Sequence, residues 1–260
     1  MKDIFYEYWK DNQNTIFAQK QIEYPGRLHF HRAFELAYIC EGQAKYIVDT
    51  ETILASPDHI VFCHCYYQHA SAFAPAHSKY VIAIPEHLTK DIALLFSNST
   101  LPALLTDKEF NRTLLPFFEK LVNDADSISG MLSKGYAQVI FGSLAEHYDG
   151  VATIPKNKNI SLIADILDYI DNHFQEPITL DSISAHFGYN KTYFSRLFNK
   201  HIGTALNNYV NMIRLDKFER LYKESNGEHI TELIFACGFS SLPTFYRAWN
   251  FRKNKTGPFS

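Results

Sequence analysis

Hydrophobic positions repeat in the C-terminal part of the chain. Residues 180–198 and 230–249 place apolar side chains at matching positions, and a glycine followed by an aromatic residue stands in the middle of each segment. These central pairs are Gly188–Tyr189 and Gly238–Phe239. Each segment predicts a helix, a tight turn that glycine permits and a second helix, at about residues 179–200 and 229–251. This is the helix-turn-helix layout, whose second helix enters the major groove of DNA.

Residues 27–84 follow a different pattern, with short runs of aromatic and β-branched residues between turn-forming residues. The runs are Phe34–Cys40, Ala44–Val48 and Ile60–Phe62. Each run has the length and composition of a β-strand. Many short strands with turns between them predict an antiparallel β-barrel or jelly roll.

Two helices are predicted after these strands. Residues 106–109, Thr-Asp-Lys-Glu, form a capping-box sequence ahead of apolar residues at helical spacing. A second amphipathic helix is predicted near residues 133–148, with these side chains on one face: Tyr136, Val139, Ile140, Leu144 and His147. This face either packs on its own barrel or pairs with its twin in a homodimer, because apolar stripes of this kind also form seams between helices.

The chain therefore divides into two domains. Residues 1–150 form a β-barrel domain with trailing helices, the polar residues 151–159 form a linker, and residues 160–260 form an all-α domain. Within the second domain, residues 206–222 predict a long helix that holds the two helix-turn-helix units apart. The predicted fold class is α+β with two domains.

Composition and charge agree with this division. Hydrophobic residues make up 46% of the 260 residues, which excludes a disordered chain. From Lys156 onward there are 13 Lys and Arg against 10 Asp and Glu, so this part carries +3 and the rest −6. A mildly basic helical domain fits DNA binding. Four unevenly spaced cysteines and the lack of a membrane-spanning apolar run lead us to expect a cytoplasmic protein with reduced thiols and no membrane partner.

The predicted second helices carry side chains suited to DNA. In the first unit the outer residues can hydrogen-bond base edges and phosphates, and arginine can bind guanine through two hydrogen bonds. These residues are Lys191, Thr192, Ser195, Arg196 and Asn199. The corresponding residues of the second unit are Leu242, Thr244, Arg247 and Asn250, of which the leucine is suited to thymine methyl groups. Two such helices on one spacer predict major-groove contacts one helical turn, about 10 bp, apart.

The C-terminal domain resembles the DNA-binding domain of the AraC/XylS family of bacterial transcription regulators. The matching residues include Gly188–Asn190, Phe194–Phe198, Ile230–Leu233, Gly238–Ser240 and Phe245–Trp249. The resemblance implies control of transcription at a promoter or operator in double-stranded DNA. It also implies a small-molecule effector, and contact with RNA polymerase if the protein is an activator.

The N-terminal domain resembles the cupin barrel that serves as the sensor in many such regulators. His29-Phe-His31, Glu35 and Gly42 reproduce the first cupin motif, and His69 lies where the second motif would supply a histidine. Alternation along a strand places His29, His31 and Glu35 on one face. If that face points into the barrel, two imidazoles and a carboxylate meet there.

We predict that these groups orient a small ligand, sugars being common ligands in this family. The predicted ligand-binding residues are His29, His31, Glu35, Tyr38, Tyr46 and His69, with Phe34 and Phe62 as further apolar walls. No cofactor is expected. The alternative is a divalent metal such as Zn, Fe, Mn or Ni held by His29, His31, Glu35 and His69.

The sequence contains no nucleophile–base pairing, phosphate-binding glycine loop or dinucleotide fingerprint. It therefore predicts a sequence-specific, DNA-binding transcription regulator that senses a small molecule through its barrel, and not an enzyme. The alternative from another class is a metal-dependent cupin enzyme, of dioxygenase or isomerase type, fused to a helical domain.

Overall fold

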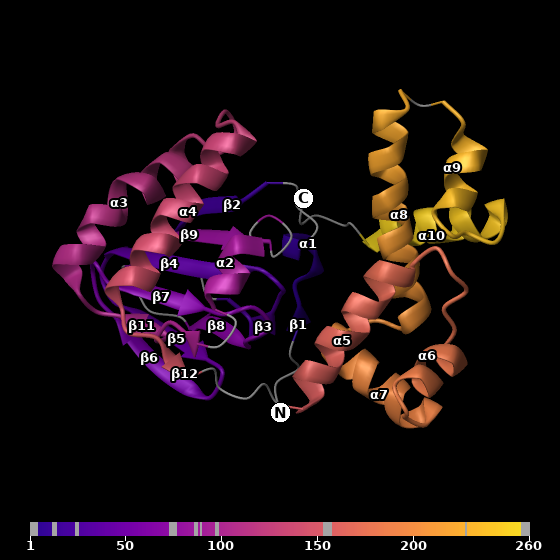
Figure 1. The fold of residues 1–260 in the computed structure, drawn as a ribbon, viewed down its shortest axis with the longest axis horizontal. Coiled ribbons are helices and arrows are strands. Elements are labelled where there is room, and N and C mark those ends of the chain that lie inside the picture. The colour runs from indigo at the N-terminus through magenta and orange to yellow at the C-terminus, as the bar shows by residue number, and fades with distance from the viewer. Residues whose placement is uncertain are drawn as a thin grey trace. The chain divides into compact units, whose positions relative to one another are not determined.

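The computed structural model describes residues 5–11, 15–23, 26–72, 77–85, 88, 90–96, 99–152, 158–226 and 228–255 of the chain. The chain divides into two compact units, residues 1–156 and 157–260 (Figure 1). Every helix within the described ranges is too short or too polar to cross a lipid bilayer.

The N-terminal unit contains two five-stranded β-sheets. The first sheet has the strand order β1 (Phe5–Tyr6), β3 (His29–Phe30), β8 (His69–Ala72), β5 (Ala44–Val48) and β6 (Glu51–Ala55). The second has the order β11 (Leu104–Leu105), β7 (Ile60–Cys63), β4 (Phe34–Glu41), β9 (Ser78–Ile84) and β2 (Phe17–Ile22). Neighbouring strands pair antiparallel except β1 and β3, which are parallel. The predicted antiparallel barrel is confirmed, and its three predicted strands are β4, β5 and β7.

A hydrophobic core fills the space between the two sheets. Strand β4 alternates along its length, as the period of two in a strand requires. Ala37 and Ile39 face the other sheet, while Phe34 and Tyr38 point to the opposite side, against helices. The first sheet contributes to the same core Ala44, Tyr46, Val48, Ile53 and Ala55.

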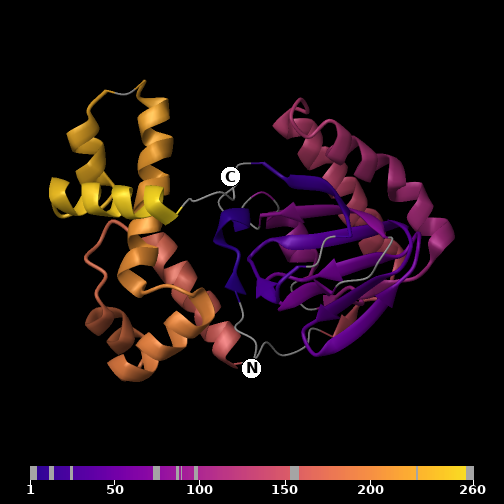
Figure 2. The same ribbon diagram turned by 180° about the vertical axis from the view of Figure 1, so that it is seen from behind.

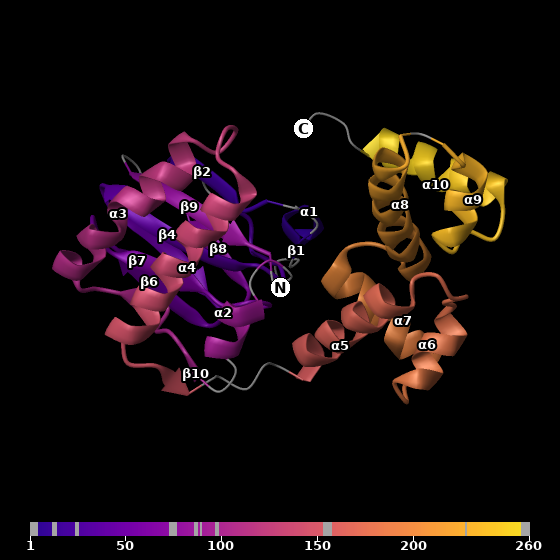
Figure 3. The same cartoon turned by 45° about the horizontal axis from the view of Figure 1, so that its top comes forward.

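Helix α2 (Lys90–Leu95) follows β9, and helices α3 (Lys108–Asn123) and α4 (Gly130–His147) follow β11. Helices α3 and α4 lie across the outer side of the second sheet (Figures 2 and 3). Phe141 of α4 packs against Phe34 and Phe62, with ring centroids 5.9 and 6.3 Å apart. The predicted capping box is wrong by one residue, because Asp107 caps α3 by accepting a hydrogen bond from the backbone N of Phe110.

Helix α4 starts earlier than the predicted residue 133, and its apolar face packs on its own barrel. Ala137, Ile140, Phe141 and Leu144 are buried within the unit. Ile140 and Leu144 are therefore not available to a homodimer seam, which corrects that part of the prediction. Three apolar side chains of α4 remain exposed: Met131, Leu132 and Val139.

The segment predicted as a linker, residues 151–159, has regular structure at both of its ends. Val151–Ala152 forms strand β12 and pairs antiparallel with β10 (Ser99–Thr100). At the other end, helix α5 (Lys158–His173) already includes Lys158 and Asn159. Residues 153–157 lie outside the described ranges.

The C-terminal unit is helical in its described residues, 158–226 and 228–255. After α5 its helices are α6 (Leu180–His186), α7 (Lys191–Ile202), α8 (Leu206–Glu224), α9 (Ile230–Ala236) and α10 (Leu242–Lys255). The pairs α6–α7 and α9–α10 are the two predicted helix-turn-helix units, and the long helix α8 joins them (Figure 1).

The two turns have the same backbone geometry. Gly188 has φ +73° and Gly238 has φ +86°, the left-handed region that favours glycine. In the first turn the N–H of Tyr189 donates to the carbonyl of Ser184 (2.9 Å). In the second the N–H of Phe239 donates to the carbonyl of Ile234 (3.4 Å), fifty residues further on. Both hydrogen bonds close the helix end with the 6→1 pattern of a Schellman motif.

The second turn also packs against the first half of the domain. A Cβ atom at Gly238 would lie 2.7 Å from both Gln175 Cα and Phe174 O, in the connection between α5 and α6. Arg214 of α8 holds the same connection, since its Nε donates to Phe174 O (2.7 Å) and its Nη2 to Glu176 O (2.8 Å). The two helix-turn-helix units are therefore fixed to each other through residues 174–176 as well as through α8.

The two glycines provide a matched test of this contact. Alanine at either position has to adopt a left-handed φ, which costs about 1–2 kcal/mol. No atom lies within 4 Å of a Cβ at Gly188, so Gly188→Ala should lose only that amount. Gly238→Ala also forces the 174–176 connection to move, and we expect it to lose about 1–3 kcal/mol more. Urea denaturation of the full chain measures both, and equal losses would contradict the close approach.

Candidate functional site

Helices α7 and α10 are the second helices of the two units. Asn190 caps α7, since its Oδ1 accepts a hydrogen bond from the backbone N of Tyr193 (2.8 Å). On the outer side of α7 four of the five predicted residues are exposed, namely Lys191, Thr192, Arg196 and Asn199, and Ser195 is half-buried. The predicted residues thus give α7 an exposed polar side that carries the positive charges of Lys191 and Arg196.

The basic residues of α7 are accessible to a partner. Lys191 Nζ lies 2.8 Å from Asp181 Oδ2 of α6, but both side chains are more than half exposed. An ion pair in such surroundings is worth only about 0–1 kcal/mol, so a phosphate group can replace the carboxylate. Arg196 is exposed one turn further along the helix.

Helix α10 differs from the prediction in two positions. Arg247 and Asn250 are exposed, but Leu242 is half-buried and packs against the core of the second unit. Thr244 is also half-buried, and its Oγ1 lies 2.9 Å from Ser241 Oγ at the start of the helix. Arg247 Nη2 donates to the same Thr244 Oγ1 (3.4 Å). Leu242 and Thr244 thus have structural contacts that the outward-facing prediction did not include.

Exposed tyrosines beside these residues were missed in the sequence. Tyr246 is 54% exposed and precedes Arg247 on α10. Tyr189 and Tyr193 are exposed at the start of α7 and stack on each other with ring centroids 5.2 Å apart. Tyr246 lies four residues before Asn250, so helical spacing places both on the same side of α10 and could have identified Tyr246 from the sequence.

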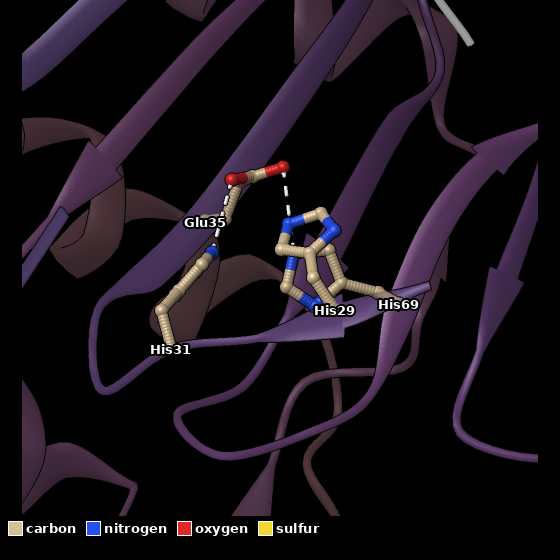
Figure 4. Close-up of side chains that lie close together, drawn as sticks. All are labelled: His29, His31, Glu35 and His69. Atoms are coloured by element: carbon tan, nitrogen blue, oxygen red, sulfur yellow. Dashed lines mark hydrogen bonds and ion pairs between the residues drawn. The ribbon is translucent and has the colours of Figure 1, made fainter. Parts of the chain in front are cut away.

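The N-terminal unit brings four predicted residues together between its sheets. His29, His31, Glu35 and His69 each offer a ligand atom, and these atoms all lie within 4.8 Å of one another (Figure 4). All four side chains are buried. We call this cluster the polar centre.

The reason for this convergence differs from the one predicted. Residues 31–33 turn the chain from β3 in the first sheet to β4 in the second, so His29 and Glu35 do not share a strand. His69 lies directly opposite His29 in the β3–β8 pairing. The carboxylate therefore approaches the imidazoles from the facing sheet.

Each imidazole is held by a backbone carbonyl at Nδ1. His29 Nδ1 lies 2.7 Å from Arg27 O, His31 Nδ1 lies 2.9 Å from Ala33 O, and His69 Nδ1 lies 2.9 Å from Tyr67 O. A carbonyl only accepts hydrogen bonds, so we assign a proton to Nδ1 of each ring. Nε2 of His31 and of His69 faces Glu35 at 3.2 and 3.7 Å, and Nε2 of His29 faces Glu7 Oε2 at 3.5 Å. Among the described residues, Nε2 of His29 and of His69 have no hydrogen-bond partner.

Burial sets the charge state of the imidazoles. It lowers the pKa of His29 to about 2, and the nearby His69 and Lys10 add to this effect. Burial and then the positive charge of Lys10 lower the pKa of His31 to about 3. Both rings therefore favour the neutral form at physiological pH. Nε2 of His31 lies 3.2 Å from Glu35 Oε2, within hydrogen-bonding distance.

Lys10 of helix α1 (Tyr8–Asp11) supplies the positive charge that this arrangement needs. Its Nζ donates to Glu35 Oε2 (2.7 Å) and lies 3.0 Å from Glu7 Oε2. Burial alone would lower the pKa of Lys10, but the two carboxylates outweigh it and raise the pKa. Burial alone would raise the pKa of Glu35, and the Lys10 ammonium holds it well below its usual range. The sequence pattern gave no signal for Lys10, because Glu35 lies 25 residues away.

A second buried lysine, Lys79, reaches from the second sheet to the first inside the barrel. Lys79 of β9 donates to Ser71 Oγ of β8 (2.6 Å), and its Nζ lies 4.8 Å from the centroid of the Tyr46 ring. Burial lowers the pKa of Lys79 to about 8. Tyr46 faces the interior, as its predicted role requires. Lys79 and Val81 are two residues apart on β9, so their side chains point to the same face of the strand. Because Val81 belongs to the core between the sheets, the sequence could have placed Lys79 there too.

Tyr38, Phe34 and Phe62 do not face the polar centre, which corrects their assignment to its walls. Tyr38 Oη donates to Asp58 Oδ1 (2.6 Å), and its ring packs on Phe118 of α3 with centroids 5.4 Å apart. In β4 the even-numbered positions point to the helices and the odd-numbered Glu35 points inward. Glu35 and Tyr38 are an odd number of residues apart on β4, so the sequence alone places their side chains on opposite faces of the strand.

The donor atoms of the polar centre are of the kind that divalent transition metals accept, namely imidazole nitrogens and a carboxylate. The Nδ1 contacts to carbonyls are also typical of metal-bound histidines. However, Glu35 Oε2 is already bound by the Lys10 ammonium, which is itself buried. The centre as folded therefore does not fit a metal ion, because its negative charge is paired with a side chain.

Comparison with known proteins identifies the C-terminal unit. A helix-turn-helix domain model matches residues 183–256. Over 94 residues the chain is 32% identical to the multiple antibiotic resistance protein MarA of Escherichia coli (strain K12), a match that covers 36% of this chain and 73% of MarA. The chain belongs to the AraC/XylS family of transcription regulators. The predicted family and the predicted class of function, a DNA-binding transcription regulator, are thus confirmed.

Solved structures of such regulators resemble the whole chain only loosely. Fatty-acid-bound ToxT from Vibrio cholerae is 13% identical with a TM-score of 0.45, and the match covers 92% of each chain. The AraC-like transcriptional activator CuxR is 14% identical with a TM-score of 0.42, covering 85% of this regulator and 78% of CuxR. Membership of the family therefore rests on the similarity to MarA and on the two helix-turn-helix units of the regulator.

Proposed function

We propose that the regulator reads DNA through the exposed sides of α7 and α10 and that its polar centre binds the small molecule that controls it. The observation that carries the first half is the pair of equivalent glycine turns, each followed by a helix with an exposed polar side. The contacts of residues 174–176 with Arg214 and Gly238 fix α7 and α10 relative to each other. This supports binding of both helices to one DNA molecule at the same time. We expect contacts in two major-groove segments about 10 bp apart.

The two arginines are the proposed base-reading residues, since each is exposed on its reading helix and a guanidinium can bind guanine through two hydrogen bonds. They are Arg196 and Arg247. The remaining proposed contacts to bases and phosphates are Lys191, Thr192, Ser195 and Asn199 on α7 and Leu242, Thr244 and Asn250 on α10. Exposed Tyr246 is added to this set.

The proposed effector is a small polyhydroxylated molecule such as a sugar. The buried Nε2 atoms of His29 and His69 are acceptors without a hydrogen-bond donor among the described residues. Hydroxyl groups of a ligand would supply those donors, and an unmet buried acceptor costs about 1–3 kcal/mol. Tyr46 would provide an aromatic surface from the same interior.

A homodimer through α4 is a further part of the proposal. With Ile140 and Leu144 buried, the side that remains for a partner carries Met131, Leu132 and Val139, of which Met131 is 87% exposed. Exposed apolar side chains at helical spacing fit a helix–helix contact between two copies.

Arg196→Ala tests the proposed DNA reading. Genomic fragments selected by the full-length regulator provide the operator, and binding is then measured against scrambled DNA at fixed salt. If Arg196 reads a base, the variant should lose about 1–3 kcal/mol of binding to the operator and discriminate less at one position. Arg220→Ala, which removes an exposed arginine from α8 and the same charge, should keep that discrimination. Unchanged discrimination in Arg196→Ala would remove Arg196 from this role, and no selected sequence at all would sink the proposed function.

A panel of sugars tests the proposed sensing. A sugar that binds the folded regulator at about 100 times its Kd should add about 2.7 kcal/mol to the free energy of unfolding and so raise Tm. The rise should disappear in His69→Ala and persist in His229→Ala, an exposed histidine of the other unit. A rise that persists in His69→Ala would place the ligand elsewhere.

Sedimentation of the full-length regulator tests the dimer. The double variant Met131→Glu/Val139→Glu introduces two like charges at the proposed seam and should shift the protein to monomer at concentrations where the wild type is dimeric. Ile22→Glu places a charge on an exposed apolar residue of β2 and should leave the dimer intact. A monomeric wild type would contradict the proposal.

A further inference from the structure

The polar centre combines a metal-type donor set with a cation that belongs to the chain itself. We propose that the ammonium group of Lys10 occupies the cation position of this centre and thereby closes the barrel to divalent metal ions. Only residues 5–11 and the polar centre take part, so this role of Lys10 does not depend on DNA binding.

The contacts of Lys10 place its charge at the atoms a metal would need. Its Nζ is 2.7 Å from Glu35 Oε2, the same oxygen that lies 3.2 Å from His31 Nε2. Lys10 is only 6% exposed. A divalent ion bound to that oxygen would lie beside a buried ammonium group, and like charges repel strongly where water is excluded.

A cation is required here whatever its source, because a buried carboxylate is tolerated only when it is paired. Oε2 of Glu35 lies 3.2 Å from Nε2 of His31, where a metal ion would be bound by both atoms. In this chain the ammonium group of Lys10 lies 2.7 Å from the same carboxylate oxygen.

The backbone delivers Lys10 to this position. Strand β1 pairs parallel with β3, so that Phe5 lies opposite His29 and Tyr6 opposite Phe30. The rings of Tyr6 and Phe30 stack with centroids 5.0 Å apart, and Tyr6 is buried. Helix α1 begins two residues later and carries Lys10 in its last turn. Residues 5–11 are thus anchored along the strand that supplies His29.

An ordinary ion pair explains less of the geometry. A Lys10–Glu35 pair alone would not require three histidines whose Nδ1 atoms are fixed by carbonyls and whose Nε2 atoms face carboxylates. Nε2 of His31 and of His69 faces Glu35, and Nε2 of His29 faces Glu7. These rings form the coordination set of a metal centre in which the ion has been replaced. Removing the ammonium should therefore make the set available to a metal.

The test uses tag-free, full-length protein and Co²⁺ as the probe, near neutral pH. Wild type, Lys10→Met and Lys10→Met/His31→Ala are loaded and desalted, and the retained cobalt and its visible absorption bands are measured. Lys10→Met should bind Co²⁺ more tightly than wild type by roughly tenfold or more, and the double variant should lose that gain. Lys20→Met, which removes an exposed lysine from β2, should behave as wild type.

Thermal melts with and without Co²⁺ keep the test decisive if Lys10→Met is unstable. Loss of the ammonium leaves Glu35 buried and unpaired, so the metal-free variant should melt below wild type, and Co²⁺ should restore its Tm or its folding. Three results would overturn the proposal: wild type that retains stoichiometric metal dependent on His31, Lys10→Met that gains no cobalt affinity or thermal stability, and cobalt retained by the double variant.

Discussion

The close approach of Gly238 to the backbone of Phe174 and Gln175 is the contact on which the DNA-binding unit depends. No side chain fits there, and the same residue has to adopt a positive φ to end α9. Arg214 reinforces the contact with two hydrogen bonds to carbonyls of the same connection. The two helix-turn-helix units therefore form one body, which fixes α7 and α10 relative to each other. In the proposed binding of two grooves at once, such preorganisation would lower the entropic cost.

The barrel obeys a different constraint, the pairing of buried charge. Glu35 lies between two sheets, where an unpaired carboxylate would be strongly unfavourable. The chain resolves this with Lys10, so residues 5–11 are tied to the interior of the barrel. Burial lowers the pKa of His29 and of His31, and the positive charge of Lys10 adds to this effect. The proposed ligand-binding residues and the residues that hold this segment in place are therefore the same: Glu35 and the histidines around it.

Sequence patterns predicted the fold well where the signal was local. The helix pairs α6–α7 and α9–α10 lie in the two segments where the repeat predicted them. The predictions were wrong where they had to say what a given face of a strand or helix packs against. Tyr38 was grouped with Glu35, although their parity along β4 puts them on opposite sides of the sheet. Ile140 fits a dimer seam by its spacing, but an apolar stripe does not specify which surface covers it, and here the barrel does.

The sequence by itself determined the two helix-turn-helix units and the family. Helix periodicity, caps and the left-handed glycine depend on neighbours within a few residues, so the repeat at an offset of fifty could be read directly from the chain. It also marked His29, His31, Glu35 and His69 as a group. Only the tertiary structure decided which cation pairs with the carboxylate of this group. The ion pair between Lys10 and Glu35 joins helix α1 to a strand of the second sheet, and no local pattern records it. Charge pairing in a core depends on which elements pack together, and that is settled only when the sheets close.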